Sequence, residues 1–123
     1  MTSEPTACPA LKFAVLHHTG IEASHFDFLV ETDPKSDLST WRLDAWPIPV
    51  DSPIQAKRLR DHRRLYLDYT GPIPGQRGYV ARVDHGLCSI NVAPNVILIQ
   101  LPTLRLRLEM ENPELWWAST SIK

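Results

Sequence analysis

Apolar and polar residues alternate with a period of two in several short stretches of the chain. The clearest is residues 25–31, HFDFLVE, where the even positions are apolar and most odd positions are polar. The odd positions are His25, Asp27, Leu29 and Glu31. In a β-strand these side chains share one face, and Phe26, Phe28 and Val30 share the other. Residues 104–110, LRLRLEM, alternate strictly, so we predict a strand over each stretch, half-buried with a charged outer face at residues 104–110.

Other apolar stretches indicate further strands, and turn residues separate them. The expected strands cover residues 12–17, 41–43, 78–84, 87–92, 96–101 and 115–117. Residues 71–75 are expected to form a loop, and Asp84-His85-Gly86 a hairpin-like turn. Eleven prolines and five glycines interrupt the chain, so a helical turn or two is expected only within residues 55–64. Roughly seven or eight short strands without βαβ alternation predict an all-β fold, a small antiparallel β-barrel with at most one or two short helical turns.

The composition fits one folded domain over residues 1–123, with 43% hydrophobic and 22% charged residues, and we expect residues 1–10 to form a flexible N-terminal segment. The formal net charge of -1 excludes a strong overall positive field, so any recognition of phosphate must be local. Cys8 and Cys88 lack CxxC spacing, which argues against a zinc knuckle, a thioredoxin-type site or a disulfide scaffold. Since the sequence has no leader-like or membrane-spanning stretch, we expect a cytoplasmic protein without a membrane partner.

His25 and Asp27 stand two residues apart in a predicted strand, which places an imidazole and a carboxylate on one face, about 7 Å apart at Cβ. A histidine from the end of the preceding strand, His17 or His18, would complete a set of two histidines and one carboxylate that leaves coordination positions open on a metal. Alternation from a buried Val15 points His17 like Val15 and His18 the opposite way, so His18 is the preferred ligand. The alternatives are a pair of histidines that only caps the strand end, and a surface pair of His25 and Asp27.

A second cluster of reactive side chains lies in residues 57–64, KRLRDHRR, which hold five of the thirteen Lys and Arg residues. The usual explanation of such a run is a solvated face. Here the run leads into Tyr66, and His62 precedes Tyr66 by four residues. A guanidinium, an imidazole and a phenol from this stretch could therefore meet one phosphate group.

Taken in order, these two stretches resemble the 3′-phosphoesterase domain of bacterial DNA ligase D, a multi-domain enzyme of end joining. The first motif of that family, His-x5-His-x-Asp-x-Arg after an apolar strand, is similar to residues 13–18, FAVLHH, followed by residues 25–28, HFDF, with one more residue between the histidines. The second motif, Asp-His-x3-Tyr-x-Asp-Phe-x-Gly-x-Ile-Pro, is similar to residues 61–74, DHRRLYLDYTGPIP. The resemblance covers residues 11–86.

The resemblance implies a small antiparallel β-barrel with the site at its centre or mouth. The implied ligands of a divalent metal, Mn²⁺ in that family, are His18, His25 and Asp27. The resemblance further implies that His62 and Tyr66 are catalytic and contact the scissile phosphate, with Arg58 as another phosphate partner. The implied activity is metal-dependent hydrolysis of a 3′-phosphate or phosphodiester at a nucleic-acid end, DNA or RNA. A DNA-repair ligase or polymerase is the implied protein partner.

Leu29 stands where the first family motif has an arginine. Leucine cannot donate a hydrogen bond to phosphate, which favours a second hypothesis, a non-catalytic module that keeps the barrel and binds nucleic-acid ends or a protein. The arginines that could replace the missing one from a neighbouring segment are Arg42, Arg58 and Arg60. A third hypothesis combines His25 and Asp27 with a distal histidine such as His85 as the triad of an iron oxygenase.

Overall fold

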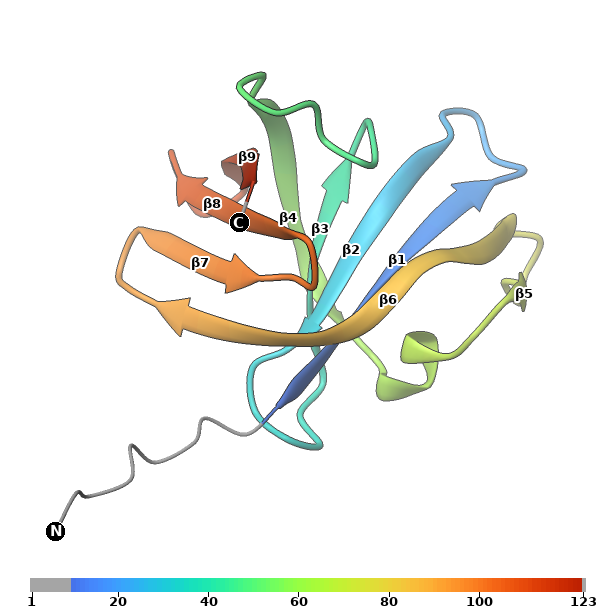
Figure 1. Cartoon of the computed structure of the whole chain (residues 1–123). Coiled ribbons are helices and arrows are strands. Elements are labelled where there is room, and N and C mark those ends of the chain that lie inside the picture. Colours follow the sequence, from blue (N-terminus) through green and yellow to red (C-terminus); the bar gives the residue numbers. More distant parts are fainter. Residues whose placement is uncertain (1–9, 123) are drawn as a thin grey trace, which may run out of the picture.

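The computed structural model of the protein describes residues 10–122 and consists almost entirely of β-strands (Figure 1). The strands are β1 (Leu11–Thr19), β2 (His25–Glu31), β3 (Leu38–Leu43), β4 (Ile54–His62), β5 (Gly71–Pro72), β6 (Tyr79–Val92), β7 (Val96–Gln100), β8 (Leu104–Met110) and β9 (Leu115–Ile122). A 3₁₀ helix, η1 (Arg64–Leu67), lies between β4 and β5. In this part of the chain, no helix has the length and apolarity needed to span a membrane. The flexible segment expected at residues 1–10 lies, apart from Ala10, outside the described residues.

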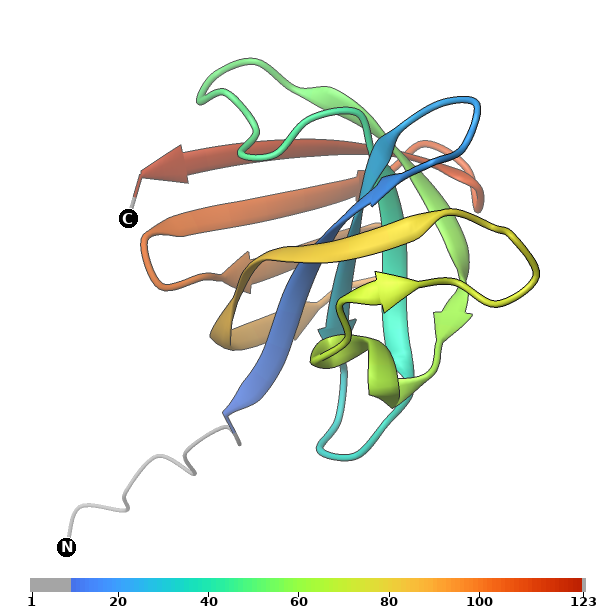
Figure 2. The same ribbon diagram turned by 90° about the vertical axis from the view of Figure 1, so that its right-hand side faces the viewer.

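The strands form one antiparallel sheet in the order β1-β2-β3-β4-β9-β8-β7-β6-β5. β1 pairs with β2 on one side and with β6 on the other, which closes the sheet into a ring (Figure 2). The all-β, barrel-like fold predicted from the sequence is therefore confirmed. The closure also brings the start of β6 beside the end of β1, where Tyr79 lies opposite Thr19.

β4 corrects one prediction from the sequence, because residues 55–62 are extended rather than helical. The strand pairs with β3 on one side and, through residues 54–57, with β9 on the other. The charged side chains of this stretch are compatible with a helix, but pairing with two neighbouring strands overrides such local preferences. The helical turn begins only at Arg64, in η1. β5 likewise falls within a stretch that was expected to be a loop.

β6 corrects a second prediction, because the expected hairpin turn at residues 84–86 is absent and the strand continues through them. It pairs with β1 over residues 79–88 and with β7 over residues 89–92. A Cβ atom at Gly86 would lie 3.3 Å from a ring carbon of Phe13. Gly86 therefore allows close packing of β6 against β1 and does not form a turn.

Two apolar clusters pack on opposite faces of β1 and β2. The larger fills the interior of the ring, and its members on the first three strands are Leu11, Phe13, Val15, Phe28, Val30, Trp41 and Leu43. The smaller lies on the outer face and consists of Ala14, Leu16, Leu29, Leu38, Leu67 and Val80. Leu67 belongs to η1, so η1 and the chain that follows it cover part of this outer face (Figure 2). The strand pair thus has apolar side chains on both faces, and its outer face continues into a polar region at one end.

Candidate functional site

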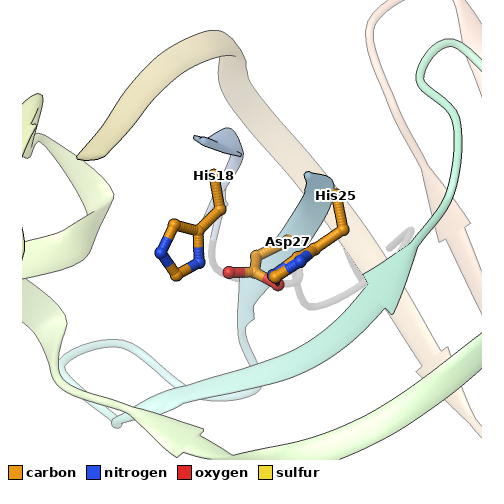
Figure 3. A group of neighbouring side chains, drawn as sticks. All are labelled: His18, His25 and Asp27. Atoms are coloured by element: carbon orange, nitrogen blue, oxygen red, sulfur yellow. Dashed lines mark ion pairs between the residues drawn. The ribbon is translucent and has the colours of Figure 1, made fainter. Parts of the chain in front are cut away.

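The register of β1 against β2 brings three polar side chains together on the outer face. His18 lies opposite His25, and Leu16 lies opposite Asp27. Because His25 and Asp27 are two residues apart, both point to the side on which His18 lies, and Figure 3 shows the three side chains converging from the two strands. One potential ligand atom from each residue lies within 4.8 Å of the others. The structure therefore brings together the residues expected to bind a metal, whose role as ligands stays a prediction.

The alternation along β1 separates His17 from this cluster. The ring of His17 stacks on Phe26, with centroids 4.4 Å and planes 12° apart. The ring of His18 meets that of His25 edge-on, with centroids 4.9 Å apart. His85 does not belong to the potential metal-binding group found among residues 10–122. The arrangement favours His18 over His17 as a ligand and does not support a triad that includes His85.

Main-chain carbonyl groups determine which nitrogen of each imidazole faces the cluster. Nδ1 of His25 lies 3.1 Å from O of Ala23 and must be the donor, because a carbonyl oxygen only accepts. Nε2 of His18 donates in the same way to O of Arg77, at 2.8 Å. The other nitrogens, Nε2 of His25 and Nδ1 of His18, therefore face Asp27 (Figure 3) and carry lone pairs when the rings are neutral. Contacts of this kind orient the histidine ligands of metal sites.

Burial favours the neutral form of His25. Desolvation lowers the pKa of His25 below its ordinary value, and the charges of Arg42 and His18 lower it further, against the opposing effects of the Ala23 carbonyl and Asp27. A neutral imidazole is the form that binds a metal ion. The 3.3 Å contact between Nε2 of His25 and Oδ1 of Asp27 then joins two acceptors and is not a hydrogen bond.

Asp27 is the member of the cluster whose surroundings most clearly indicate a ligand. The residue is 4% exposed, and its Oδ1 has no hydrogen-bond partner within residues 10–122. Burying a carboxylate costs free energy unless donors or a cation compensate its charge, and a neutral His25 offers it no donor. Two nitrogen donors and one carboxylate suit a divalent transition-metal ion and leave coordination positions free. The residues present therefore fit a metal of the kind that the sequence implies.

A cavity of about 380 Å³ opens beside His18 and Asp27. Its apolar lining comes from Leu16, Ile73 and Val80. Its other polar residues are Arg60, Asp61, His62, Arg63, Tyr66 and Arg77. No ion pair formed within residues 10–122 involves any of the three arginines. The cavity thus places uncompensated positive charge beside the carboxylate and the imidazoles, an arrangement that suits an anionic ligand.

His62 and Tyr66, which the sequence pairs, both line this cavity. Nδ1 of His62 donates to O of Arg60 at 3.0 Å, so Nε2 is the nitrogen that remains available. The rings of His62 and Tyr66 lie 5.8 Å apart and are inclined by 65°. The turn of η1 directly after β4 brings both side chains to the same side of the cavity. Their contact with a phosphate stays a prediction.

Arg58 is not brought to the cavity, contrary to its expected role as a phosphate partner. In β4 it lies opposite Trp41, which belongs to the interior cluster. Its guanidinium carbon lies 4.7 Å from the centroid of the Trp41 ring, and the group donates to O of Thr40 and to Oδ1 of Asp61. The register of β4 against β3 therefore directs Arg58 away from the site. Leu29 is fully buried in the outer cluster and does not line the cavity either.

The cluster of His18, His25 and Asp27 lies at the end of the β1–β2 pair, on the face opposite the interior apolar cluster. It follows Leu16 and Leu29 along the outer face of the ring. The interior is filled by the large apolar cluster, which includes Phe28 and Trp41. Because the interior is packed, the polar residues of β1 and β2 lie on the outer face, where the chain after β4 forms the other wall of the cavity.

Arg77 is the cavity residue that the sequence analysis missed. Arg77 precedes β6 and lies 59 residues after His18. Its carbonyl oxygen accepts a hydrogen bond from Nε2 of His18. The two residues meet because β6 pairs with β1, and no local pattern in the sequence indicates that pairing. Arg63 and Asp61, by contrast, lie in the charged run that already marks His62 as a candidate.

A comparison of the chain with models of known protein families found no match. A search of the curated proteins also found no match. The chemistry of the site is therefore inferred from its own side chains.

Proposed function

We propose that the protein is a metal-dependent phosphoesterase, similar to the 3′-phosphoesterase domain of ligase D, that hydrolyses a phosphate ester at a nucleic-acid 3′ end. The observation that carries this proposal is one cavity whose lining combines two kinds of side chain. One kind is the buried Asp27, whose Oδ1 has no hydrogen-bond partner within residues 10–122, with the imidazole of His18; the other is a set of arginines that form no ion pair within these residues. A phosphate group can bind both a divalent cation and guanidinium groups, so it is the ligand that uses both kinds of side chain.

The metal would be held by Nδ1 of His18, Nε2 of His25 and the carboxylate of Asp27. When bound there, a divalent ion, expected to be Mn²⁺, would supply Lewis-acid polarisation of a phosphoryl oxygen and activation of water. The guanidinium groups of Arg60, Arg63 and Arg77 bind phosphate oxygens and orient the ester. These arginines supply the positive charge that the leucine at position 29 cannot supply.

His62 and Tyr66, which line the same cavity as His18 and Asp27, act on the phosphate. The hydrogen bond from Nδ1 of His62 to O of Arg60 fixes the ring and leaves Nε2 as the nitrogen that exchanges a proton with the leaving oxygen. The hydroxyl of Tyr66 donates to a phosphate oxygen. The edge-on contact of the two rings limits their movement relative to one another.

The proposal is tested by release of phosphate from a 3′-phosphorylated DNA or RNA oligonucleotide in the presence of Mn²⁺. His62→Ala is expected to lower turnover by about 10²- to 10⁴-fold while Mn²⁺ affinity stays at the parent value. His17→Ala is the matched control, because this neighbouring histidine points to the opposite face and should retain both properties. Turnover that survives a chelator, or His62→Ala protein that hydrolyses at the parent rate, would contradict the assignment.

A non-catalytic module that binds nucleic-acid ends is the second candidate function, and the burial of Leu29 favours it. Leucine at this position cannot donate to a phosphate, unlike the arginine of the family motif. Such a module would bind the 3′-phosphorylated oligonucleotide and release no phosphate at any Mn²⁺ concentration. Measuring binding and hydrolysis on the same samples therefore separates the two functions.

A further inference from the structure

The connection between β5 and β6, residues 73–78, contacts the metal-binding cluster with its backbone and the cavity with a side chain. O of Arg77 accepts the hydrogen bond from Nε2 of His18, at 2.8 Å. The same residue lines the cavity, and its Nε donates to O of Pro74 at 2.7 Å. N of Ile73 donates to O of Gly78 at 2.8 Å, which closes the segment into a compact loop. The orientation of His18 therefore depends on where this loop lies.

Gly78 is what allows the loop to lie against the end of β1. Its φ is +89°, and a Cβ atom there would overlap O of Thr19 and lie 3.1 Å from Nε2 of His18. On the other side of the contact, a Cβ atom at Gly20 would lie 3.3 Å from Cα of Gly78. Both glycines have positive φ, which residues with a Cβ adopt at a cost. The close approach of two glycines thus brings the Arg77 carbonyl within reach of His18.

We propose that the loop of residues 73–78 is a positioning element that sets metal affinity through His18. The Arg77 carbonyl holds the proton on Nε2 of His18, so that Nδ1 presents its lone pair to the ion beside Asp27. Without this contact, the imidazole is free to rotate and to exchange tautomers, and both changes remove Nδ1 from the ion. Gly78 is accordingly a positioning residue and not a ligand. The inference rests on the metal site of the proposed function but not on its hydrolytic activity.

The test compares Gly78→Ala with Gly75→Ala. Both substitutions place a Cβ at positive φ in the same loop and therefore share that conformational cost, whereas only Gly78→Ala also presses on O of Thr19 and on His18. A Cβ at Gly75 would meet only Nε of Arg77, at 3.7 Å, and would not touch His18. Loss of an outer contact to a ligand lowers metal affinity by about 10- to 100-fold. By calorimetric titration with Mn²⁺, Gly78→Ala should show this loss and Gly75→Ala should keep the parent affinity.

A second measurement reads the position of the proton directly in the metal-free protein. Long-range ¹H–¹⁵N NMR correlations of the imidazoles should show His18 protonated on Nε2 in the parent and in Gly75→Ala, and a mixture of tautomers in Gly78→Ala. Gly20→Ala, which presses on the same contact from the residue after β1, should show the same change to a smaller extent and replaces Gly78→Ala if that variant does not fold.

Parent affinity together with an unchanged His18 tautomer in the Gly78 and Gly20 variants would overturn the inference. Equal losses in Gly78→Ala and Gly75→Ala would also overturn it, because they would show general strain of the loop. A parent protein that binds no Mn²⁺ would refute both this inference and the proposed function. A parent protein that binds Mn²⁺ through a Gly78-dependent site but releases no phosphate would refute only the proposed function.

Discussion

Asp27 and Glu31 lie on the same face of β2, and their surroundings are opposite. Their exposed fractions are nearly equal, 4% and 3%. The carboxylate of Glu31 accepts hydrogen bonds from the backbone N of Lys12, at 2.7 Å, and from the guanidinium of Arg64. Oδ1 of Asp27 has no hydrogen-bond partner within residues 10–122 and lies 3.3 Å from Nε2 of His25. The protein itself therefore compensates one buried charge, whereas the described residues supply no hydrogen bond to Oδ1 of the other.

The segment around η1 affects the two ends of β2 differently. Arg64, at the start of η1, forms an ion pair with Glu31 and so holds η1 against β2 at that end. Towards the other end of β2, the residues before and after η1 line the cavity and donate nothing to Asp27. Buried polar groups in folded proteins are almost always hydrogen-bonded, and the exceptions concentrate at functional sites. Glu31 is a structural carboxylate by this criterion, and Asp27 is a candidate functional one.

Asp27→Asn should produce the largest change, a loss of Mn²⁺ affinity of more than about 100-fold, because a neutral amide replaces the charged ligand. In the metal-free protein the same change should raise the free energy of unfolding by about 1 kcal/mol, since the amide can donate to Nε2 of His25. Calorimetric titration and urea unfolding measure the two effects. A variant with parent affinity for Mn²⁺ would remove the distinction between the two carboxylates.

Glu31→Gln is the matched substitution at the other carboxylate, and it should lower the free energy of unfolding by about 2 kcal/mol. The amide directs N–H groups at Arg64 and removes the charge that this guanidinium contacts. The Arg64 side chain is 35% exposed, so water compensates part of the loss and the figure stays below the roughly 3–5 kcal/mol of a fully buried pair. Mn²⁺ affinity should not change. Urea unfolding and Mn²⁺ titration measure both properties in both variants. A loss of Mn²⁺ affinity in Glu31→Gln, or a loss of stability in Asp27→Asn alone, would contradict the roles given to the two carboxylates.

The alternation of residues 25–31 predicts both the strand and the two sets of side chains on its faces, because period-two patterning is a local signature in the sequence. The same alternation, continued backward from Val15 in β1, places His18 beside His25 and His17 on the far face. The partnership of Glu31 with Arg64 is not predictable in this way, since the two residues lie 33 positions apart and meet only through the fold of η1 over the sheet.

Long-range pairing also explains the predictions that the structure corrects. Local composition in residues 55–64 is compatible with a helix, but pairing with β3 and β9 makes most of it a strand and directs Arg58 to Trp41. Gly86 indicates a turn from the sequence alone, but in the structure it lies within β6 and allows the strand to pack closely against Phe13. Arg77 reaches His18 through the closure of the ring, a property of the whole sheet. Residues that depend on strand register or ring closure therefore escape a reading of the sequence alone.

The smallest effect expected is the contribution of Glu31 to the pH dependence of stability. Desolvation alone would raise the pKa of Glu31, but the hydrogen bonds from Arg64 and the backbone N of Lys12, with the charge of Arg64, outweigh it and hold the pKa below its ordinary value of 4.5. A carboxyl whose pKa is lower in the folded state stabilises the protein fully above the unfolded pKa and loses that contribution as the pH falls through the folded pKa.

The free-energy difference between the parent and Glu31→Gln should therefore be constant from about pH 7 to about pH 5.5. Below about pH 4.5 it should shrink by at most about 1.4 kcal/mol per pH unit. Urea unfolding of both proteins from about pH 7 to about pH 3 measures this difference in the free energy of unfolding. A difference that stays constant over the whole range would show that the carboxylate of Glu31 is not the charged partner of Arg64.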